Sequence, residues 1–215
     1  MGLIFDLLKK KHDPSQILVK LALRNALNGC ETVLDIGCGI APTMRELAVK
    51  HSVGVEGYPP FSEHIRKHNL QDELVECDVR DLSGHFKPNQ FDACIALDLI
   101  EHLTKEDGLK LIQSVERIAK KRVVFFTPSG FLPQKHSASD DLQAHLSGWD
   151  ADEMRKLGYK VVGLLGPKKL RGEYHMLKNR PKFFWSLISL AAQCLHSKYH
   201  PENAAAIMCI KYLDK

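Results

Sequence analysis

Apolar and polar positions along the chain follow two alternating patterns. Short runs rich in valine and isoleucine are typical of strands that are buried on both faces of a parallel sheet. The segments between them repeat apolar side chains every three or four residues, as amphipathic helices do. This alternation predicts an α/β fold with a doubly wound, mostly parallel sheet. Strands are expected at Thr32–Ile36, Ser52–Glu56, Glu73–Cys77, Phe91–Leu97 and Arg122–Thr127, and helices at Pro14–Leu27, Ala41–Lys50, Pro60–Asn69 and Lys105–Ala119.

The pattern changes after the fifth strand, where a long polar loop covers Thr127–Gly148. A strand, a helical excursion and a final strand follow, and this order favours an antiparallel hairpin added to a parallel sheet. We therefore expect seven strands with an antiparallel last strand, in a single domain of residues 1–215 that carries a helical excursion at 167–200. The later elements are expected at Asp150–Leu157 (helix), Tyr159–Leu165 (strand), Lys182–Leu195 (helix) and Ala204–Leu213 (strand).

Charge is distributed unevenly. The chain has 215 residues, 44% of them hydrophobic, which suits one α/β domain with a sizeable core. Its net charge of +4 is concentrated between residues 167 and 182, where Glu173 is the single acidic residue. A general nucleic-acid-binding protein more often carries basic residues along a whole face, so nucleic acid is not the expected partner. The basic residues of this stretch are Lys168, Lys169, Arg171, Lys178, Arg180 and Lys182.

The cysteines and the first residues bear on the compartment. Six cysteines occur without a Cys-x-x-Cys pair, which favours free thiols in a reducing compartment. Met1–Lys11 is apolar and then basic, the reverse of the order in a secretory leader. These features predict a cytoplasmic protein.

Gly37 and Gly39 stand at a strand-to-helix turn, directly after the first expected strand. Glycines there let the backbone turn sharply and approach a ligand, and the following helix offers unpaired N–H groups. A dinucleotide fingerprint would need a third glycine at position 42, which is proline. Proline removes a donor, so the turn is a poor cradle for a pyrophosphate and disfavours a dinucleotide oxidoreductase.

Three carboxylates lie at or near the ends of the first three expected strands. Glu56 follows the glycine turn by about 20 residues, where a carboxylate can accept both hydroxyls of a ribose. Asp78 is placed to accept from an adenine amino group, and Asp35 to meet a positively charged amino group. Because parallel strands end at one edge of a sheet, the three carboxylates are expected to line one crevice.

These motifs together resemble those of class I S-adenosylmethionine-dependent methyltransferases, of the small prokaryotic kind known as methyltransferase type 11 or 12. The likeness spans residues 14–165 and includes Asp35-x-Gly37-x-Gly39, Glu56, Cys77-Asp78-Val79-Arg80 and the segment from Phe91 through Asp98 to Leu103. It implies a Rossmann-like sheet and S-adenosylmethionine as cofactor. Ala41 replaces a frequent third glycine, and Pro42 is unusual. The resemblance and the strand ends assign cofactor contacts to Asp35, Gly37, Cys38, Gly39, Glu56, Gly57, Asp78, Val79, Leu97 and Asp98.

The spacing of Asp98, Glu101 and His102 would place all three on one face if the chain turns helical after Leu97. With His145, this cluster resembles the small-RNA 2′-O-methyltransferases and some quinone O-methyltransferases, which implies that these four residues bind Mg²⁺ or another divalent ion. The same motif is widespread in metal-free members, where the histidine acts as a base or only packs. His102, Glu101 and His145 are the candidate catalytic residues in either case.

Phe183–Leu195 is apolar except for Ser186, Ser189 and Gln193. Thirteen residues are too few to span a bilayer as a helix. A buried helix, a dimer contact, a lid over the acceptor and a helix lying on the inner membrane face remain open. The basic residues upstream favour phosphate, so peripheral membrane contact through 168–195 is one expectation, in a monomer or a homodimer.

These observations favour methyl transfer from S-adenosylmethionine to a hydroxyl, less so to nitrogen or carbon, of a small-molecule, sugar or lipid-linked acceptor. The segment Leu97-Asp98-Leu99-Ile100 lacks the Asn/Asp-Pro-Pro-Tyr/Phe motif of enzymes that methylate amino groups of nucleic acids. The alternatives are a metal-dependent RNA 2′-O-methyltransferase and a non-catalytic S-adenosylmethionine-binding protein.

Overall fold

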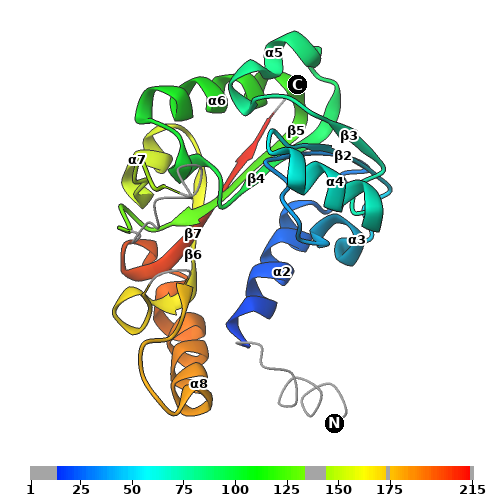
Figure 1. Cartoon of the computed structure of the whole chain (residues 1–215). Helices are drawn as coiled ribbons and strands as arrows, with labels where there is room; N and C mark the ends of the chain where they lie inside the picture. Colours follow the sequence, from blue (N-terminus) through cyan, green and yellow to red (C-terminus); the bar gives the residue numbers. More distant parts are fainter. Residues whose placement is uncertain (1–13, 134–143, 173–174, 214–215) are drawn as a thin grey trace.

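A single seven-stranded sheet organises the chain, with strand order β3-β2-β1-β4-β5-β7-β6 in a computed structural model (Figure 1). The structure describes residues 14–133, 144–172 and 175–213. Neighbours among the first five strands are parallel, and β7 is antiparallel to both β5 and β6. The predicted Rossmann-like sheet with an antiparallel last strand is therefore confirmed. The strands are β1 Thr32–Ile36, β2 His51–Val55, β3 Glu73–Val75, β4 Phe91–Leu97, β5 Ala119–Pro128, β6 Lys160–Pro167 and β7 Ala204–Tyr212.

Helices cover both faces of the sheet, and each face has its own apolar core. Residues of α2 and α3 pack with Val33, Val124 and Met208 on one face. Residues of α5, α6 and α7 pack with Leu34, Phe125 and other strand residues on the opposite face. The helices are α2 Ser15–Ala26, α3 Thr43–Leu47, α4 Pro59–His68, α5 Leu82–His85, α6 Lys105–Ile118, α7 Ala151–Lys156 and α8 Lys182–Ala192.

Several predicted bounds were wrong for identifiable reasons. The helix expected at Ala41–Lys50 is only α3, because Pro42 precedes its first turn and Ala48 adopts a left-handed conformation with φ of 53°. The third strand ends at Val75 rather than Cys77. β5 begins earlier than predicted, since its first residues include exposed lysines that hide the strand pattern.

The long excursion between β6 and β7 carries α8. This helix continues into a π-helical turn, Gln193–Ser197, before a 3-10 turn at Pro201–Asn203 leads into β7. In the described part of the chain, no helix combines the length and the apolar character needed to cross a membrane. The predicted N-terminal helix is present as α2, and residues 134–143 of the predicted polar loop lie outside the described residues.

Candidate active site

The glycine turn follows β1, as expected. Gly37 and Gly39 have φ of 62° and 55°, a region that side chains with a Cβ rarely adopt. The backbone N–H of Cys38 between them donates to Val55 O at 3.1 Å, which ties the turn to β2. A Cβ at Gly39 would meet nothing within 4 Å, so the space over this residue is open to a ligand.

The Glu56 carboxylate is held against this turn. One of its oxygens accepts from the Gly39 N–H at 3.1 Å and the other from the Tyr58 N–H at 2.9 Å. Each carboxylate oxygen can accept a second hydrogen bond, so Glu56 retains capacity for ligand hydroxyls. The residue that sequence spacing assigns to a ribose therefore lies beside the open space over Gly39.

Asp35 is buried behind the turn, with 3% of its surface exposed. Burial raises the pKa of its carboxyl to about 7, although a hydrogen bond from Gln71 Nε2 at 2.9 Å opposes the rise. A buried carboxylate needs a positive partner to stay ionised, and a ligand ammonium group would supply one. Burial also raises the pKa of the neighbouring Cys38 thiol, which makes Cys38 a packing residue rather than a nucleophile.

The remaining predicted cofactor residues lie at the neighbouring strand ends. Asp78 precedes a 3-10 turn at Val79–Asp81, and both of its oxygens accept from Arg80, at 2.9 and 2.5 Å. These bonds lower the pKa of the Asp78 carboxyl. Leu97 is the last residue of β4. A Cβ added at Gly57 would lie 3.2 Å from Cys77 O, so a larger residue at this position would be crowded.

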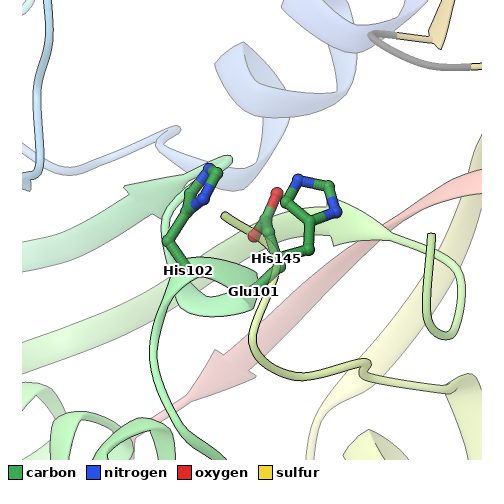
Figure 2. Close-up of side chains that lie close together, drawn as sticks. All are labelled: Glu101, His102 and His145. Carbon is green, nitrogen blue, oxygen red and sulfur yellow. The ribbon is translucent and has the colours of Figure 1, made fainter. Parts of the chain in front are cut away.

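Glu101, His102 and His145 form the one group of three potential metal-binding side chains in the described parts of the chain, with their ligand atoms all within 4.8 Å of one another. Figure 2 shows the two imidazole rings on either side of the Glu101 carboxylate. Glu101 and His102 lie in a 3-10 turn, Ile100–His102, which follows β4. His145 comes from the segment that precedes α7. We call these three residues the Glu-His-His cluster.

Backbone hydrogen bonds bring His145 to this place. The N–H groups of Leu146 and Ser147 donate to Glu101 O at 2.8 and 3.1 Å. The buried indole of Trp149 donates to Ile100 O at 3.4 Å and to Ser147 Oγ at 3.0 Å. The segment from residue 144 to 149 is thus fastened along the 3-10 turn, which sets His145 opposite His102.

Both imidazoles have one nitrogen fixed and one available. His102 Nδ1 lies 3.1 Å from Ala144 O, and His145 Nδ1 lies 2.7 Å from Leu132 O. A carbonyl oxygen only accepts, so each Nδ1 carries a proton, and in the neutral ring Nε2 is then the nitrogen with the lone pair. Metal-binding histidines and histidine bases are commonly oriented in this way.

Glu101 is the most buried member of the cluster, with 2% of its surface exposed. Burial, followed by the nearby charge of Asp98, raises the pKa of its carboxyl to about 8, although Thr127 Oγ1 donates to it at 2.9 Å. Burial also lowers the pKa of His145. Without a bound cation, both groups are mainly neutral at pH 7.

Asp98 departs from the sequence prediction. The chain is not helical at this residue, whose φ is 48°, and only residues 100–102 form a 3-10 turn, so Asp98, Glu101 and His102 do not share a helical face. Asp98 lies outside the Glu-His-His cluster. Its carboxylate is 3.7 Å from His175 Nε2.

Gln71, Thr127 and His175 were missed by sequence reasoning. Gln71 lies after α4 in no recognisable motif and contacts Asp35 through the fold. Thr127 was assigned only to a strand end, although its hydroxyl contacts Glu101. His175 was hidden in the basic stretch and stands near Asp98 and, at 6.0 Å between ring centroids, near Phe126.

Comparisons with known proteins relate the fold and part of the sequence to methyltransferases. Residues 34–127 match a family described as a methyltransferase domain. A SAM-dependent methyltransferase from Archaeoglobus fulgidus is similar over 97% of this chain and 99% of its own, with 18% identity and a TM-score of 0.55. The plantazolicin methyltransferase BpumL, solved with SAH, is similar over 91% of this chain and 82% of its own, with 14% identity and a TM-score of 0.55. The small RNA methyltransferase HEN1 is similar over 94% of this chain and 25% of its own, with 14% identity and a TM-score of 0.60.

Identities this low establish the fold alone, whereas the family match assigns residues 34–127 to a methyltransferase domain. Together, the fold and this domain support a class I, S-adenosylmethionine-dependent methyltransferase. The residues present fit the cofactor. The space over Gly39 is open to a ligand, and the Glu56 carboxylate beside it can accept from ribose hydroxyls. The buried Asp35 carboxyl, whose pKa is raised, suits the positively charged amino group.

Proposed function

We propose that this enzyme methylates a hydroxyl group of a small-molecule, sugar or lipid-linked acceptor, and that Glu101, His102 and His145 form its reacting centre. The observation that carries the proposal is the Glu-His-His cluster, in which the Nδ1 of each imidazole faces a carbonyl oxygen and Nε2 is left to accept a proton. A hydroxyl is a poor nucleophile at neutral pH until its proton is withdrawn. Bases gathered at one point therefore serve a hydroxyl acceptor better than a neutral amine, which is nucleophilic before it loses a proton.

The transfer itself needs alignment and a place for one proton. S-adenosylmethionine supplies an electrophilic methyl group on a sulfonium, and the acceptor oxygen forms its bond to that carbon as the carbon–sulfur bond breaks. The hydroxyl proton passes to an imidazole Nε2. The lowered pKa of His145 keeps this ring neutral before the reaction. The Leu132 carbonyl at 2.7 Å then stabilises the ring after it gains the proton.

The cluster also fits a divalent cation. One buried carboxyl and two oriented imidazoles within 4.8 Å of one another are a suitable donor set. A cation there would keep Glu101 ionised and would lower the pKa of an acceptor hydroxyl bound to it. Imidazoles favour Mn²⁺ or another softer ion, and the carboxylate is compatible with Mg²⁺ as well.

The experiment is incubation of the protein with methyl-labelled S-adenosylmethionine and a fractionated cell extract, with and without Mn²⁺. We expect label in a lipid, glycan or small-molecule fraction, held as an ether that resists acid and base. Label held as an N-methylamine or on carbon would contradict the proposal. His85→Ala, an exposed histidine on α5, serves as a control that should label the same fraction.

An RNA 2′-O-methyltransferase is a second candidate, because His145 joins Glu101 and His102 as the resemblance to the small-RNA enzymes implies. Label in RNA, on ribose O2′ after digestion to nucleosides, would select it. Retention of the protein on RNA should then fall steeply with salt.

A further inference from the structure

α8 turns its polar side chains inward. Ser186, Ser189 and Gln193 are each at most 5% exposed, and Ser197 in the following π-helical turn is fully buried. These are the polar positions that interrupt the otherwise apolar helix. An amphipathic helix of a globular protein ordinarily buries its apolar side instead.

The edge strand explains this reversal. β6 is the last strand of the sheet, so one side of its backbone has no strand partner. Gln193 supplies the missing bonds: its Oε1 accepts from Gly166 N, and its Nε2 donates to Gly163 O, both at 2.7 Å. Ser189 Oγ donates to Leu165 O at 3.2 Å.

Glycines at the contact let the helix approach this closely. A Cβ added at Gly166 would overlap the Ser189 side chain and lie 2.7 Å from Ser189 O. A Cβ at Gly163 would overlap Ser197 O, in the π-helical turn that continues α8. The helix is therefore built to cover a polar strand edge, and its apolar side is left facing away from the protein.

The outer side of α8 and of its π-helical turn carries exposed large apolar side chains. These side chains are between 36% and 82% exposed, with Leu195 the most exposed. Exposed apolar surfaces of this kind mark sites of interaction, because water disfavours them. We define the α8 outer face as Phe183, Phe184, Leu187 and Ile188 of α8, together with Leu195 of the π-helical turn that continues it.

The charges around this face restrict its occupant. Residues 174–201 contain no aspartate or glutamate. Exposed basic residues lie before α8, at its first residue and after its π-helical turn, and exposed Tyr199 lies at the same end as Leu195. A second copy of the chain would bring the same positive charges against themselves, whereas an anionic surface would complement them. The basic residues are Lys178, Arg180, Lys182 and Lys198.

We propose that the α8 outer face docks this enzyme on the surface of an anionic phospholipid bilayer. The apolar side chains enter the boundary between headgroups and acyl chains, and the basic residues contact the phosphates. At 11 residues, α8 lies in the plane of the bilayer and does not cross it. This docking is independent of the acceptor and of the role of the Glu-His-His cluster.

The test is co-sedimentation of the full chain with vesicles of phosphatidylcholine alone or with about one third phosphatidylglycerol. We expect the partition coefficient to be at least roughly tenfold higher for the anionic vesicles and to fall as sodium chloride is raised. Equal, weak sedimentation with both kinds of vesicle would overturn the proposal. This comparison uses the unmodified protein and needs no variant to fold.

Variants separate the bilayer from a protein partner. Leu187→Gln combined with Ile188→Gln should lower partition into anionic vesicles by roughly tenfold or more. Leu109→Gln, a comparably exposed leucine on α6, should leave it unchanged. Light scattering without vesicles should show a monomer. A dimer that the double substitution dissociates would assign the face to a second copy and overturn the proposal.

Discussion

Glu101→Gln should stabilise the folded protein at neutral pH even though it alters the Glu-His-His cluster. Glu101 is almost fully buried, and burial raises the pKa of its carboxyl from 4.5 to about 8. Glutamine has nearly the same shape and remains neutral. Its carbonyl oxygen can keep the hydrogen bond that Thr127 Oγ1 donates at 2.9 Å.

The size of this stabilisation follows from the difference in proton binding by Glu101 between the folded and unfolded states. An acid with a raised pKa in the folded state contributes most to stability below its unfolded pKa, and that contribution is lost as the pH rises toward the folded pKa. At about 1.36 kcal/mol for each unit of pKa, the loss is about 3 kcal/mol at pH 7 and about 5 kcal/mol above pH 8. Glutamine shows no such loss. The stability difference between variant and wild type should therefore grow by these amounts from low to high pH.

Urea unfolding of both proteins at about pH 4.5, 7 and 8.5 measures this difference. Glu106→Gln is a matched control, because the Glu106 side chain is 79% exposed, and its effect should stay small and nearly constant. If the difference in unfolding free energy between Glu101→Gln and the wild type does not change with pH, burial does not raise the pKa of Glu101 as argued.

The same pair of proteins tests cation binding. A cation that binds only the folded state at about one hundred times its dissociation constant adds about 2.7 kcal/mol of stability. Mn²⁺ should therefore raise the melting temperature of the wild type and leave Glu101→Gln nearly unchanged. An equal rise in both proteins would place the cation elsewhere.

Further predictions concern the cofactor crevice and its support. Burial raises the pKa of Asp35 to about 7, so its carboxyl becomes ionised as the pH rises from about 6 to 8. Calorimetry should therefore show S-adenosylmethionine binding roughly tenfold more tightly at the higher pH. An affinity that does not change with pH would place the ammonium group elsewhere. Glu56→Gln should weaken the same binding by roughly tenfold or more through loss of charge-assisted hydrogen bonds, and an unchanged dissociation constant would contradict the ribose contact. Gly108→Val should destabilise the protein by roughly 1–3 kcal/mol and shift tryptophan fluorescence, because even a Cβ there lies 2.5 Å from Trp149 Cζ2; unaltered urea unfolding would contradict the close packing.

The glycine turn and the strand ends that the sequence assigns to the cofactor were located correctly, because their sequence signals are local. Gly37 and Gly39 each need a conformation that few residues other than glycine adopt, and Glu56 directly follows β2. The parallel order of the strands then carries these residues to one edge. Gln71 could not be identified in this way, since its contact with Asp35 depends on how the chain after α4 packs.

The grouping of the Glu-His-His cluster was predicted in part. Glu101 and His102 are neighbours in sequence, but the 3-10 turn, rather than an α-helix, leaves Asp98 outside the cluster. The position of His145 depends on hydrogen bonds from the N–H groups of Leu146 and Ser147 to Glu101 O. A periodic sequence pattern does not predict such contacts between distant segments.

α8 shows a further limit of sequence patterns. The spacing of Ser186, Ser189 and Gln193 identified a polar stripe but not the direction in which it points. Hydrophobicity alone would turn that stripe outward. The unpaired backbone groups of β6 decide the orientation, because buried N–H and C=O groups without partners are more costly than exposed apolar side chains.

The proposed reacting centre is tested most directly by His145→Ala, assayed for the rate of methyl transfer to the labelled acceptor fraction and, in parallel, for binding of S-adenosylmethionine. If His145 acts on the acceptor hydroxyl, the rate should fall by roughly 100-fold or more while the affinity for the cofactor changes little. A wild-type rate in this variant would show that the Glu-His-His cluster is not where the acceptor reacts.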